Sequence, residues 1–311
     1  MIVIVGPTAV GKTKLSIEIA KQFNGAIISG DSMQVYKGMD IGTAKITPEE
    51  MQGIPHYMID IKDPRESFSV ADFKRYVTKY IDHIYEQGQL PMIVGGSGLY
   101  IESVLYDYQF PAVRRDEAFT QQLKTMIKEV GIQPLYERLK VIDPKYAERI
   151  HPNHHRRVIR ALEIYEVTGK TMTELEQEQP KEPLYDAIII GLDMERDLLY
   201  QRINDRVDQM VAAGLIDEVK ALYDQGLKDT QAMRAIGYKE LIPYIEGRQS
   251  LEQAIDILKR NSRRFAKRQY TWFKNRLDVK WYMIHPDTID KDYQIILKDL
   301  AGILNRRIEL D

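Results

Sequence analysis

The first twenty residues constrain the fold of this chain more than any other segment does. A run of apolar, mostly β-branched residues leads into Gly6-Pro7-Thr8-Ala9-Val10-Gly11-Lys12-Thr13, and an amphipathic stretch follows. The segment matches the phosphate-binding pattern Gly-x4-Gly-Lys-Thr, which lies between a strand and a helix. Its glycines let successive N–H groups point at one anion, and the helix N-terminus adds the positive end of its dipole. The segment therefore predicts a bound di- or triphosphate, with Lys12 at the outer phosphate and the Thr13 hydroxyl on a magnesium ion.

The composition excludes several other kinds of site. The 311 residues include no cysteine, which rules out disulfides, thiolate nucleophiles and cysteine-ligated zinc, and which fits a reducing compartment. No stretch approaches the ~18 apolar residues of a membrane span, and only four residues separate Met1 from the phosphate loop, too few for a secretion signal. The net charge of −2 gives no overall sign of a nucleic-acid partner, so any such sign must be local. We expect a soluble, cytoplasmic protein without a membrane segment, and we take it to be a monomer.

Short apolar runs alternate with amphipathic segments over the first third of the chain. The stretch 69–87 has apolar residues at helical spacing and is followed by a glycine. Near-continuous apolar strands separated by helices indicate a parallel sheet that is covered on both faces. After the strand at 1–5, we predict further strands at 26–29, 90–96, 187–192 and 279–284. The predicted fold class is α/β, a P-loop NTPase-like parallel sheet flanked by helices.

The strand pattern disappears in the middle of the chain. From about residue 111 to residue 183 the sequence is charged, has a helical period and is interrupted by glycines and prolines. We therefore predict a helical insertion domain at 113–183. The core that it interrupts comprises 1–112 and 184–311.

Asp31 follows the second predicted strand. Ligands of open parallel sheets bind beyond the carboxyl ends of the strands, so Asp31 should lie near the phosphate loop. A carboxylate at that place can bind magnesium-bound water or act as a general base. The alternative is a helix cap, because Asp31 and the neighbouring Ser32 both favour that position. On these residues alone, the two interpretations are equally good.

The third predicted strand differs from that of an ordinary ATPase. A Walker-B strand should end on an aspartate, whereas this one ends Gly95-Gly96-Ser97. The glycines allow a ligand to approach the backbone closely, and the Ser97 hydroxyl can bind a phosphate oxygen or magnesium; the alternative is a plain strand-to-helix turn. The segment 58–60 ends on Asp60, but its apolar run is too short for a convincing substitute. The chemistry therefore does not require the arrangement by which ATPases activate water.

Two basic clusters stand out locally. In the first, 151–160, a helical conformation puts Arg156 and Arg160 on one side while Val158 faces a core. The second, 259–276, contains no acidic residue, and four aromatic residues lie among its basic ones. A basic run is usually a solvated helix face, but eight uncompensated charges mixed with aromatics favour a polyphosphate backbone as the partner. The basic residues of the second cluster are Lys259, Arg260, Arg263, Arg264, Lys267, Arg268, Lys274 and Arg276.

Taken together, these motifs resemble the tRNA dimethylallyltransferase family, also called tRNA isopentenyltransferases. The resemblance extends over most of the chain. It is carried by GPTAVGKT (6–13), SGDSMQVYKGMDIGTAK (29–45), DFKRY (72–76), IVGGSGLY (93–100), RIHPNHHRRVIRALE (149–163), MRAIGYKEL (233–241) and AKRQYTW (266–272). The phosphate loop alone is unspecific, whereas its combination with the second and last of these motifs is highly specific.

The resemblance implies an activity and a role for individual residues. Such enzymes move a prenyl group from dimethylallyl diphosphate to N6 of the adenosine just 3′ of the anticodon, so the implied partners are the tRNA anticodon stem-loop, dimethylallyl diphosphate and Mg²⁺. Asp31 matches the general base, Lys12 and the rest of the phosphate loop match the diphosphate cradle, and Arg206 matches an arginine that holds the diphosphate. Ser97 stands where the family usually has threonine. The segments that match tRNA contacts are Asp31, Ser32, Met33 and Gln34, and Arg156, Arg157, Val158, Ile159 and Arg160. From the second basic cluster we add Arg263, Arg264, Lys267 and Arg268 as tRNA contacts.

Three other functions are compatible with parts of the sequence. A P-loop kinase would use the helical insertion as a lid and would turn over the γ-phosphate of ATP, which the loop can also bind. A nucleotide-switched RNA-binding protein would have no use for a base at Asp31. An enzyme that prenylates free adenine nucleotides would leave the cluster at 259–276 with little purpose.

Overall fold

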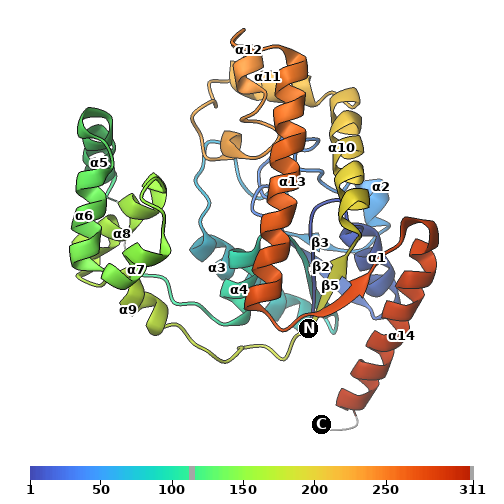
Figure 1. Cartoon of the computed structure of the whole chain (residues 1–311). Coiled ribbons are helices and arrows are strands. Elements are labelled where there is room, and N and C mark those ends of the chain that lie inside the picture. The colour runs from blue at the N-terminus through green and yellow to red at the C-terminus, as the bar shows by residue number, and fades with distance from the viewer. Residues whose placement is uncertain (112–115, 309–311) are drawn as a thin grey trace. The chain divides into compact units, whose positions relative to one another are not determined.

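The computed structural model describes residues 1–111 and 116–308. Figure 1 shows the chain, which divides into two compact units. The first comprises Met1–Leu105 together with Leu184–Asp311, and the second is Tyr106–Pro183. The first unit carries the sheet, and the second is made of helices in its described part.

The structure places the first division between the units earlier than the sequence predicts. The predicted divisions are 112/113 and 183/184, and in the structure the first lies at 105/106. The reason is that helix α4 (Gly98–Leu105) ends at Leu105, whose carbonyl oxygen accepts a 2.7 Å hydrogen bond from Leu184 N–H. The chain thus leaves the sheet-bearing unit and returns to it at one point.

The six strands are parallel and form one sheet in the order β3-β2-β4-β1-β5-β6. β1 lies between β4 and β5, and all its residues are buried, as its apolar sequence requires. The parallel sheet confirms the predicted α/β fold class. The sequence did not predict β3, because its two residues are too few to show a period. The strands are β1 (Ile2–Val5), β2 (Gly25–Gly30), β3 (His56–Tyr57), β4 (Leu90–Gly95), β5 (Ile188–Asp193) and β6 (Lys280–Met283).

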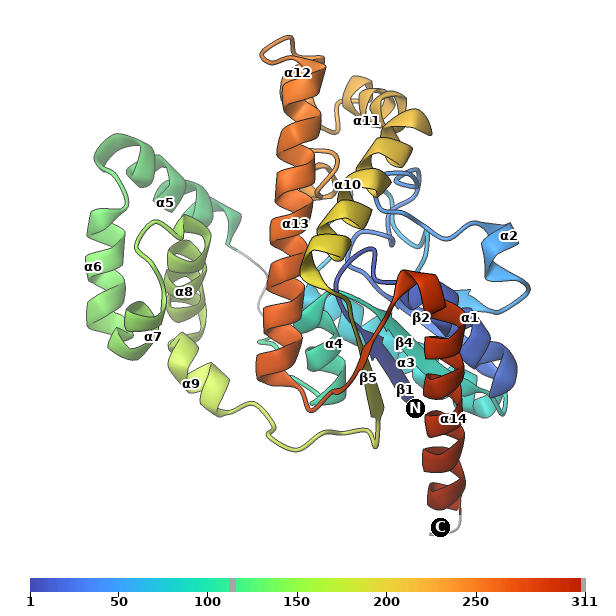
Figure 2. The ribbon, with the colours of Figure 1, turned by 45° about the vertical axis from the view of Figure 1, so that its right-hand side comes forward.

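Helices cover both faces of this sheet, with α1 and α14 on one face and α3 and α4 on the other (Figure 2). α13, the longest helix, begins at a capping box of Ser250 and Gln253 and runs beside α10. Within the described part of the chain, no helix is long and apolar enough to cross a membrane. The further helices of the first unit are α1 (Lys12–Gln22), α2 (Pro48–Met51), α3 (Val70–Glu86), α10 (Arg196–Ala212), α11 (Leu215–Asp224), α12 (Ile242–Ile245), α13 (Leu251–Arg276) and α14 (Ile289–Ile308), with 3-10 turns at Ala232–Arg234 and Pro286–Thr288.

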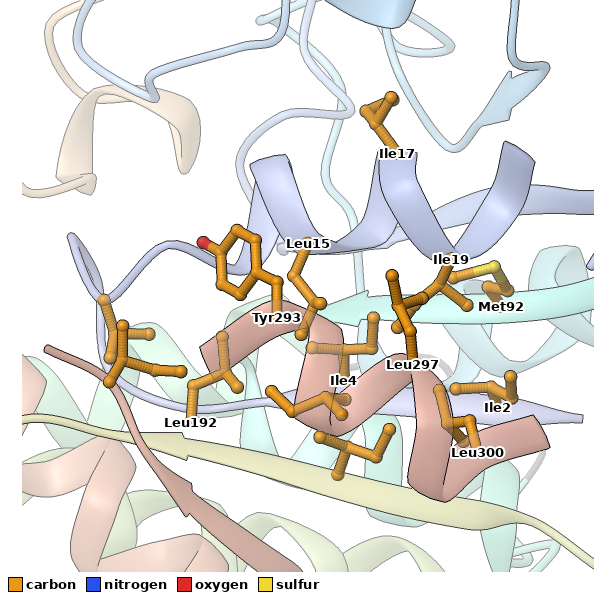
Figure 3. Close-up of a cluster of buried hydrophobic side chains, with 14 of the residues drawn as sticks. Ile2, Ile4, Leu15, Ile17, Ile19, Met92, Leu192, Tyr293, Leu297 and Leu300 are labelled. Carbon is orange, nitrogen blue, oxygen red and sulfur yellow. The ribbon is translucent and has the colours of Figure 1, made fainter. Parts of the chain in front are cut away.

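One large apolar cluster lies between the sheet, α1 and α14 (Figure 3). Ile2 and Ile4 of β1 point into it because alternate residues of a strand face the same side. α1 contributes Leu15 and Ile19, and α14 contributes Tyr293 among others. This packing fixes the start of α1, and with it the end of the phosphate loop.

The second unit consists of α5 (Glu117–Val130), α6 (Gln133–Ile142), α7 (Pro144–Arg149), α8 (His155–Thr168) and α9 (Met172–Gln177). These helices have an apolar core of their own, which includes Leu139 and Leu162. The buried carboxylate of Glu163 accepts hydrogen bonds from Thr120 and Arg160, so burial leaves that charge paired. No strand is present in the described residues of this unit.

Candidate active site

Three strands of the sheet end level with one another and bring the predicted site together. Val5 of β1 pairs with Gly95 of β4, and Gly95 pairs with Gly30 of β2. A Cβ atom at position 95 would lie 2.3 Å from the carbonyl carbon of Gly30, so only glycine fits there. The phosphate loop, Asp31 and Ser97 therefore start at the same edge of the sheet, where ligands of parallel sheets bind.

The phosphate loop occupies the predicted place between β1 and α1. The Lys12 Nζ atom donates to the carbonyl oxygens of Gly6 at 2.9 Å and Pro7 at 2.7 Å. At the other end of the loop, Gly11 has φ +111° and its carbonyl oxygen accepts the Tyr293 hydroxyl at 2.9 Å. A Cβ atom on Gly11 would lie 2.6 Å from that hydroxyl, so both the backbone angle and the space require glycine.

Side chains from distant parts of the chain brace the loop, and the sequence did not indicate them. Arg202 Nε on α10 donates to the Ala9 carbonyl oxygen at 3.1 Å. Gln269 on α13 accepts the Thr8 N–H at 3.0 Å, and Tyr293 on α14 holds the end of the loop. One pattern could have found Arg202, because it lies one helical turn before the predicted Arg206 and so shares its face.

Asp31, Lys12 and Arg206 interact electrostatically at this edge of the sheet. Burial raises the pKa of the Asp31 carboxyl, while the Met33 N–H and the charge on Lys12 act in the opposite direction. Burial lowers the pKa of Lys12 to about 7, the charge of Arg206 lowers it too, and Asp31 opposes both. Burial also lowers the pKa of Arg206. Two basic side chains and one carboxylate, all half-buried, form a site that a multiply charged anion would stabilise.

The Asp31 side chain also shapes its own turn. Its Oδ1 atom accepts the Met33 N–H at 2.8 Å. The residues after Asp31 form turns, so the helix cap that the sequence left open as an alternative is wrong, and the side chain makes an i→i+2 turn bond instead. The interaction fixes the orientation of the carboxylate through its Oδ1 atom.

Ser97 connects β4 to the turn after β2. Its hydroxyl accepts the Ser32 N–H at 3.1 Å and lies 3.5 Å from the Ser32 hydroxyl. Its own N–H donates to the Gly30 carbonyl oxygen at 3.1 Å. The residue therefore holds the backbone next to Asp31, in addition to lining the cavity described below.

Thr8 of the phosphate loop, Asp31, Ser97 and Arg206 face a cavity of about 320 Å³, whereas Lys12 is not among the residues that line it. The cavity combines a polar wall at the sheet edge with an apolar wall from α10 and α13. The polar wall includes Thr8, Asp31, Ser97 and Arg206. The apolar wall includes Ile203, Val207, Leu258 and Phe265. Such a cavity suits a ligand with an anionic end and a short hydrocarbon part.

The segment 42–44, which lines the same cavity, is anchored from two sides. The Gln34 amide accepts the Ser29 hydroxyl and donates to the carbonyl oxygens of residues 43 and 44. The Glu218 carboxylate on α11 accepts three consecutive N–H groups, those of residues 40, 41 and 42, and the Tyr238 hydroxyl. The sequence predicts Gln34 as a tRNA contact, and in the structure its side-chain amide forms hydrogen bonds with other groups of the protein.

The charges of α13 are less free than the sequence suggests. Lys259 pairs with Asp208 at 2.7 Å, Arg276 pairs with Glu102 at 2.8 Å, and Lys274 lies 3.9 Å from Asp193. The interpretation of eight uncompensated charges is therefore wrong for these three, because their acidic partners come from other elements of the fold. Of the four predicted tRNA contacts, Arg263 donates to the side chain of a neighbouring asparagine on α10, whereas Arg264, Lys267 and Arg268 are exposed.

The aromatic residues of α13 serve the fold more than a ligand. Phe273 is fully buried, Trp272 packs against Gly98, and the Tyr270 hydroxyl donates to Asp193. Phe265 alone among the four lines the cavity in the described part of the chain. Two further basic residues in the cavity wall, Arg234 and Lys239, were not predicted.

In the second unit, only part of the predicted tRNA segment is accessible. Arg156 and Arg157 are exposed, and Arg160 pairs with Glu163 at 2.8 Å. Val158 and Ile159 are 0% and 8% exposed and lie in the core of the unit, so their side chains are not accessible, and their role as tRNA contacts stays a prediction. A helix that packs against its neighbours must bury one face, and these two residues lie on it.

The residues fit a magnesium ion that arrives with its ligand better than a resident metal. Among the described residues, no three His, Cys, Asp or Glu side chains form a group that could hold a metal ion. Thr13 is exposed at the start of α1, beside the phosphate loop. Magnesium keeps several of its waters and needs few protein ligands when phosphates supply the rest.

Comparison with known proteins agrees with this geometry. The family model described as IPP transferase matches residues 34–276. A tRNA dimethylallyltransferase of Oceanobacillus iheyensis is 59% identical over 99% of this chain and 98% of its own. A tRNA dimethylallyltransferase of Halalkalibacterium halodurans is 55% identical over 99% of this chain and 98% of its own.

Solved structures give the same result. The tRNA isopentenylpyrophosphate transferase of Bacillus halodurans has a TM-score of 0.75 and 53% identity, over 99% of this chain and 98% of that one. A eukaryotic dimethylallyltransferase acting on tRNA has a TM-score of 0.78 and 33% identity, over 91% of this chain and 73% of that one. The match to the family model, the similar sequences and the similar structures all show that this chain belongs to the IPP transferase family, as the motifs in its sequence predict.

Proposed function

We propose that this protein transfers the dimethylallyl group of dimethylallyl diphosphate to N6 of the adenosine immediately 3′ of the anticodon in tRNA, and releases diphosphate. The observation that carries the proposal is the cavity in which Asp31 and Arg206 meet beside the phosphate loop and an apolar wall. The names of the related enzymes, tRNA dimethylallyltransferases and isopentenylpyrophosphate transferases, support the substrate class.

The chemistry follows from what each group can do. The exocyclic amine of adenine is a weak nucleophile because its lone pair is delocalised into the ring. Asp31 takes the N6 proton as the N6–C1 bond forms and the allylic C1–O bond breaks, and its raised pKa makes it a stronger base. Negative charge grows on the leaving diphosphate, where the positive charges of Lys12 and Arg206 stabilise it.

The same arrangement explains why the family can use a P-loop without a Walker-B aspartate. No water has to be activated, because the nucleophile is the base of the RNA. The target base has to leave its stack to reach a cavity beside the sheet, and we expect it to be flipped out of the anticodon loop. Mg²⁺, held by the Thr13 hydroxyl and the diphosphate, would add positive charge at the leaving group.

We further propose that the enzyme acts as a monomer in the cytoplasm. The absence of cysteine suits a reducing compartment.

A labelling assay tests the proposed function. Protein, Mg²⁺, labelled dimethylallyl diphosphate and bulk tRNA are incubated together, and we expect label in the RNA. A tRNA whose adenosine 3′ of the anticodon is replaced by guanosine is the matched control and should stay unlabelled. Release of γ-phosphate from ATP as the main turnover would instead indicate a kinase, and labelling of free adenine nucleotides without tRNA would indicate the nucleotide-prenylating alternative.

The exposed charges of α13 give a second prediction. Replacing Arg264, Lys267 and Arg268 together with alanine should weaken tRNA binding. The plot of log Kd against log salt should also lose about 0.7–0.9 in slope for each phosphate contact that is removed. A triple alanine variant of exposed lysines elsewhere, at positions 79, 291 and 298, controls for net charge. Equal slopes in the two variants would exclude this face of α13 from the RNA site.

A further inference from the structure

Gln269 joins the phosphate loop to the end of β4. Its side-chain Oε1 atom accepts the Thr8 N–H at 3.0 Å, and its Nε2 atom donates to the Gly96 carbonyl oxygen at 3.2 Å. The residue is 6% exposed although it lies on a helix whose outer face is strongly basic. A buried amide with both ends bonded is a specific link between two backbone segments.

The packing around Gln269 leaves little room for another arrangement. A Cβ atom on Gly96 would lie 2.0 Å from the Gln269 Nε2 atom, so the strand end and α13 approach as closely as glycine allows. One helical turn further on, Trp272 packs against Gly98, and after a second turn Arg276 pairs with Glu102 of α4. The two turns of α13 that follow the amide are therefore fixed to the start and to the body of α4.

The link extends to the residue that acts as the base. After Gly96 comes Ser97, whose hydroxyl accepts the N–H of Ser32, and Ser32 follows Asp31 directly. A continuous series of hydrogen bonds and short backbone segments thus runs from Thr8 in the diphosphate cradle to Asp31. Gln269 is the member of this series that bridges the two halves of the site.

We propose that Gln269 is a positioning residue that sets the spacing between the diphosphate cradle and Asp31. This rests on the proposed function, in which leaving group and base act at once on one substrate pair. Prenyl transfer needs the N6 atom, the allylic carbon and the leaving oxygen in line, and a displacement of about 1 Å can cost 10²-fold in rate. Gln269 touches neither substrate nor reacting atoms in this role.

An amide is the side chain that the position requires. It has to accept one backbone hydrogen and donate another, and glutamine offers both at this length. Glutamate has no hydrogen for the Gly96 carbonyl and adds a negative charge beside the diphosphate. Methionine has a similar length, but it leaves both backbone groups without partners.

The test uses Gln269→Glu and Gln269→Met in the full-length enzyme, with Asn275→Ala on the exposed face of the same helix as the control. We expect kcat to fall about 10- to 100-fold in both variants. The KM for dimethylallyl diphosphate should rise and the Kd for tRNA should stay unchanged, whereas Asn275→Ala should match the wild type. Folded variants with unchanged kcat and KM, even with a lower Tm, would reduce Gln269 to a structural residue.

Two further measurements keep the proposal testable by other routes. Binding of inorganic pyrophosphate, measured by calorimetry, should weaken in both variants. Pyrophosphate binding does not depend on prenyl transfer, so this measurement distinguishes failure of the Gln269 link from failure of the proposed function. In the wild-type protein, the Thr8 amide should be protected from hydrogen exchange, and a Thr8 amide that exchanges as fast as an exposed one would overturn the proposal even if neither variant folds.

Discussion

Asp31→Asn should lower kcat for prenyl transfer by about 10²–10⁴-fold, the usual loss when a general base is removed. Asparagine keeps the oxygen that accepts the Met33 N–H, so the turn should stay intact. The amide cannot take the N6 proton, however. Single-turnover labelling of tRNA, with both substrates saturating, measures this loss directly.

The control for this prediction is the affinity of the variant for tRNA and for pyrophosphate. The Kd for tRNA and the affinity for pyrophosphate should change little in Asp31→Asn, because neither depends on proton transfer. A variant that keeps more than a tenth of the wild-type kcat would remove Asp31 from the role of base.

Much of the fold is predictable because it depends on local patterns. Buried parallel strands read as short apolar runs, and 1–5, 90–96 and 187–192 all correspond to strands of the sheet. β3 has two half-buried residues and owes its existence to pairing with β2, which no local pattern can show. The strand order is likewise a property of the whole chain.

The site is predictable to the extent that its chemistry lies in motifs. Lys12, Asp31 and Ser97 follow three strands whose ends meet, so the sequence could place them together. The side chains that hold the phosphate loop from distant parts of the chain cannot be placed in this way. Gln269 is 261 residues away from its partner Thr8, and a glutamine within a basic helix looks like one more solvated residue until the fold buries it.

Charge counting along one helix also misleads. Lys259 and Arg276 seemed uncompensated because their acidic partners lie on α10 and α4, far away in sequence. Val158 and Ile159 entered the list of RNA contacts because the whole segment matched a motif. Within one motif, one side of a helix packs into the core and the other is exposed, and only the exposed side chains are available to a ligand.

Lys12→Met should lower kcat/KM for dimethylallyl diphosphate by about 10²–10³-fold, as the loss of one donor to developing charge usually does. The pH dependence is the more specific expectation. In the ligand-free protein the pKa of Lys12 is about 7, because burial and Arg206 disfavour the charged form. A bound diphosphate favours the charged form and so raises that pKa.

Proton uptake on binding follows from this difference in pKa. Below pH 7 Lys12 already carries its proton, so it adds no pH dependence to diphosphate affinity. Above pH 7 the lysine has to gain a proton on binding, and wild-type affinity for pyrophosphate should fall by up to about tenfold per pH unit. The ligand's own ionisation affects wild type and Lys12→Met equally, so the ratio of their affinities isolates the effect of the lysine.

Calorimetry between pH 6 and pH 9 should show that the ratio of wild-type to Lys12→Met affinity is constant at first and then declines. A ratio that stays constant over the whole range would mean that Lys12 is charged throughout, and that its burial beside Arg206 has no effect on diphosphate binding.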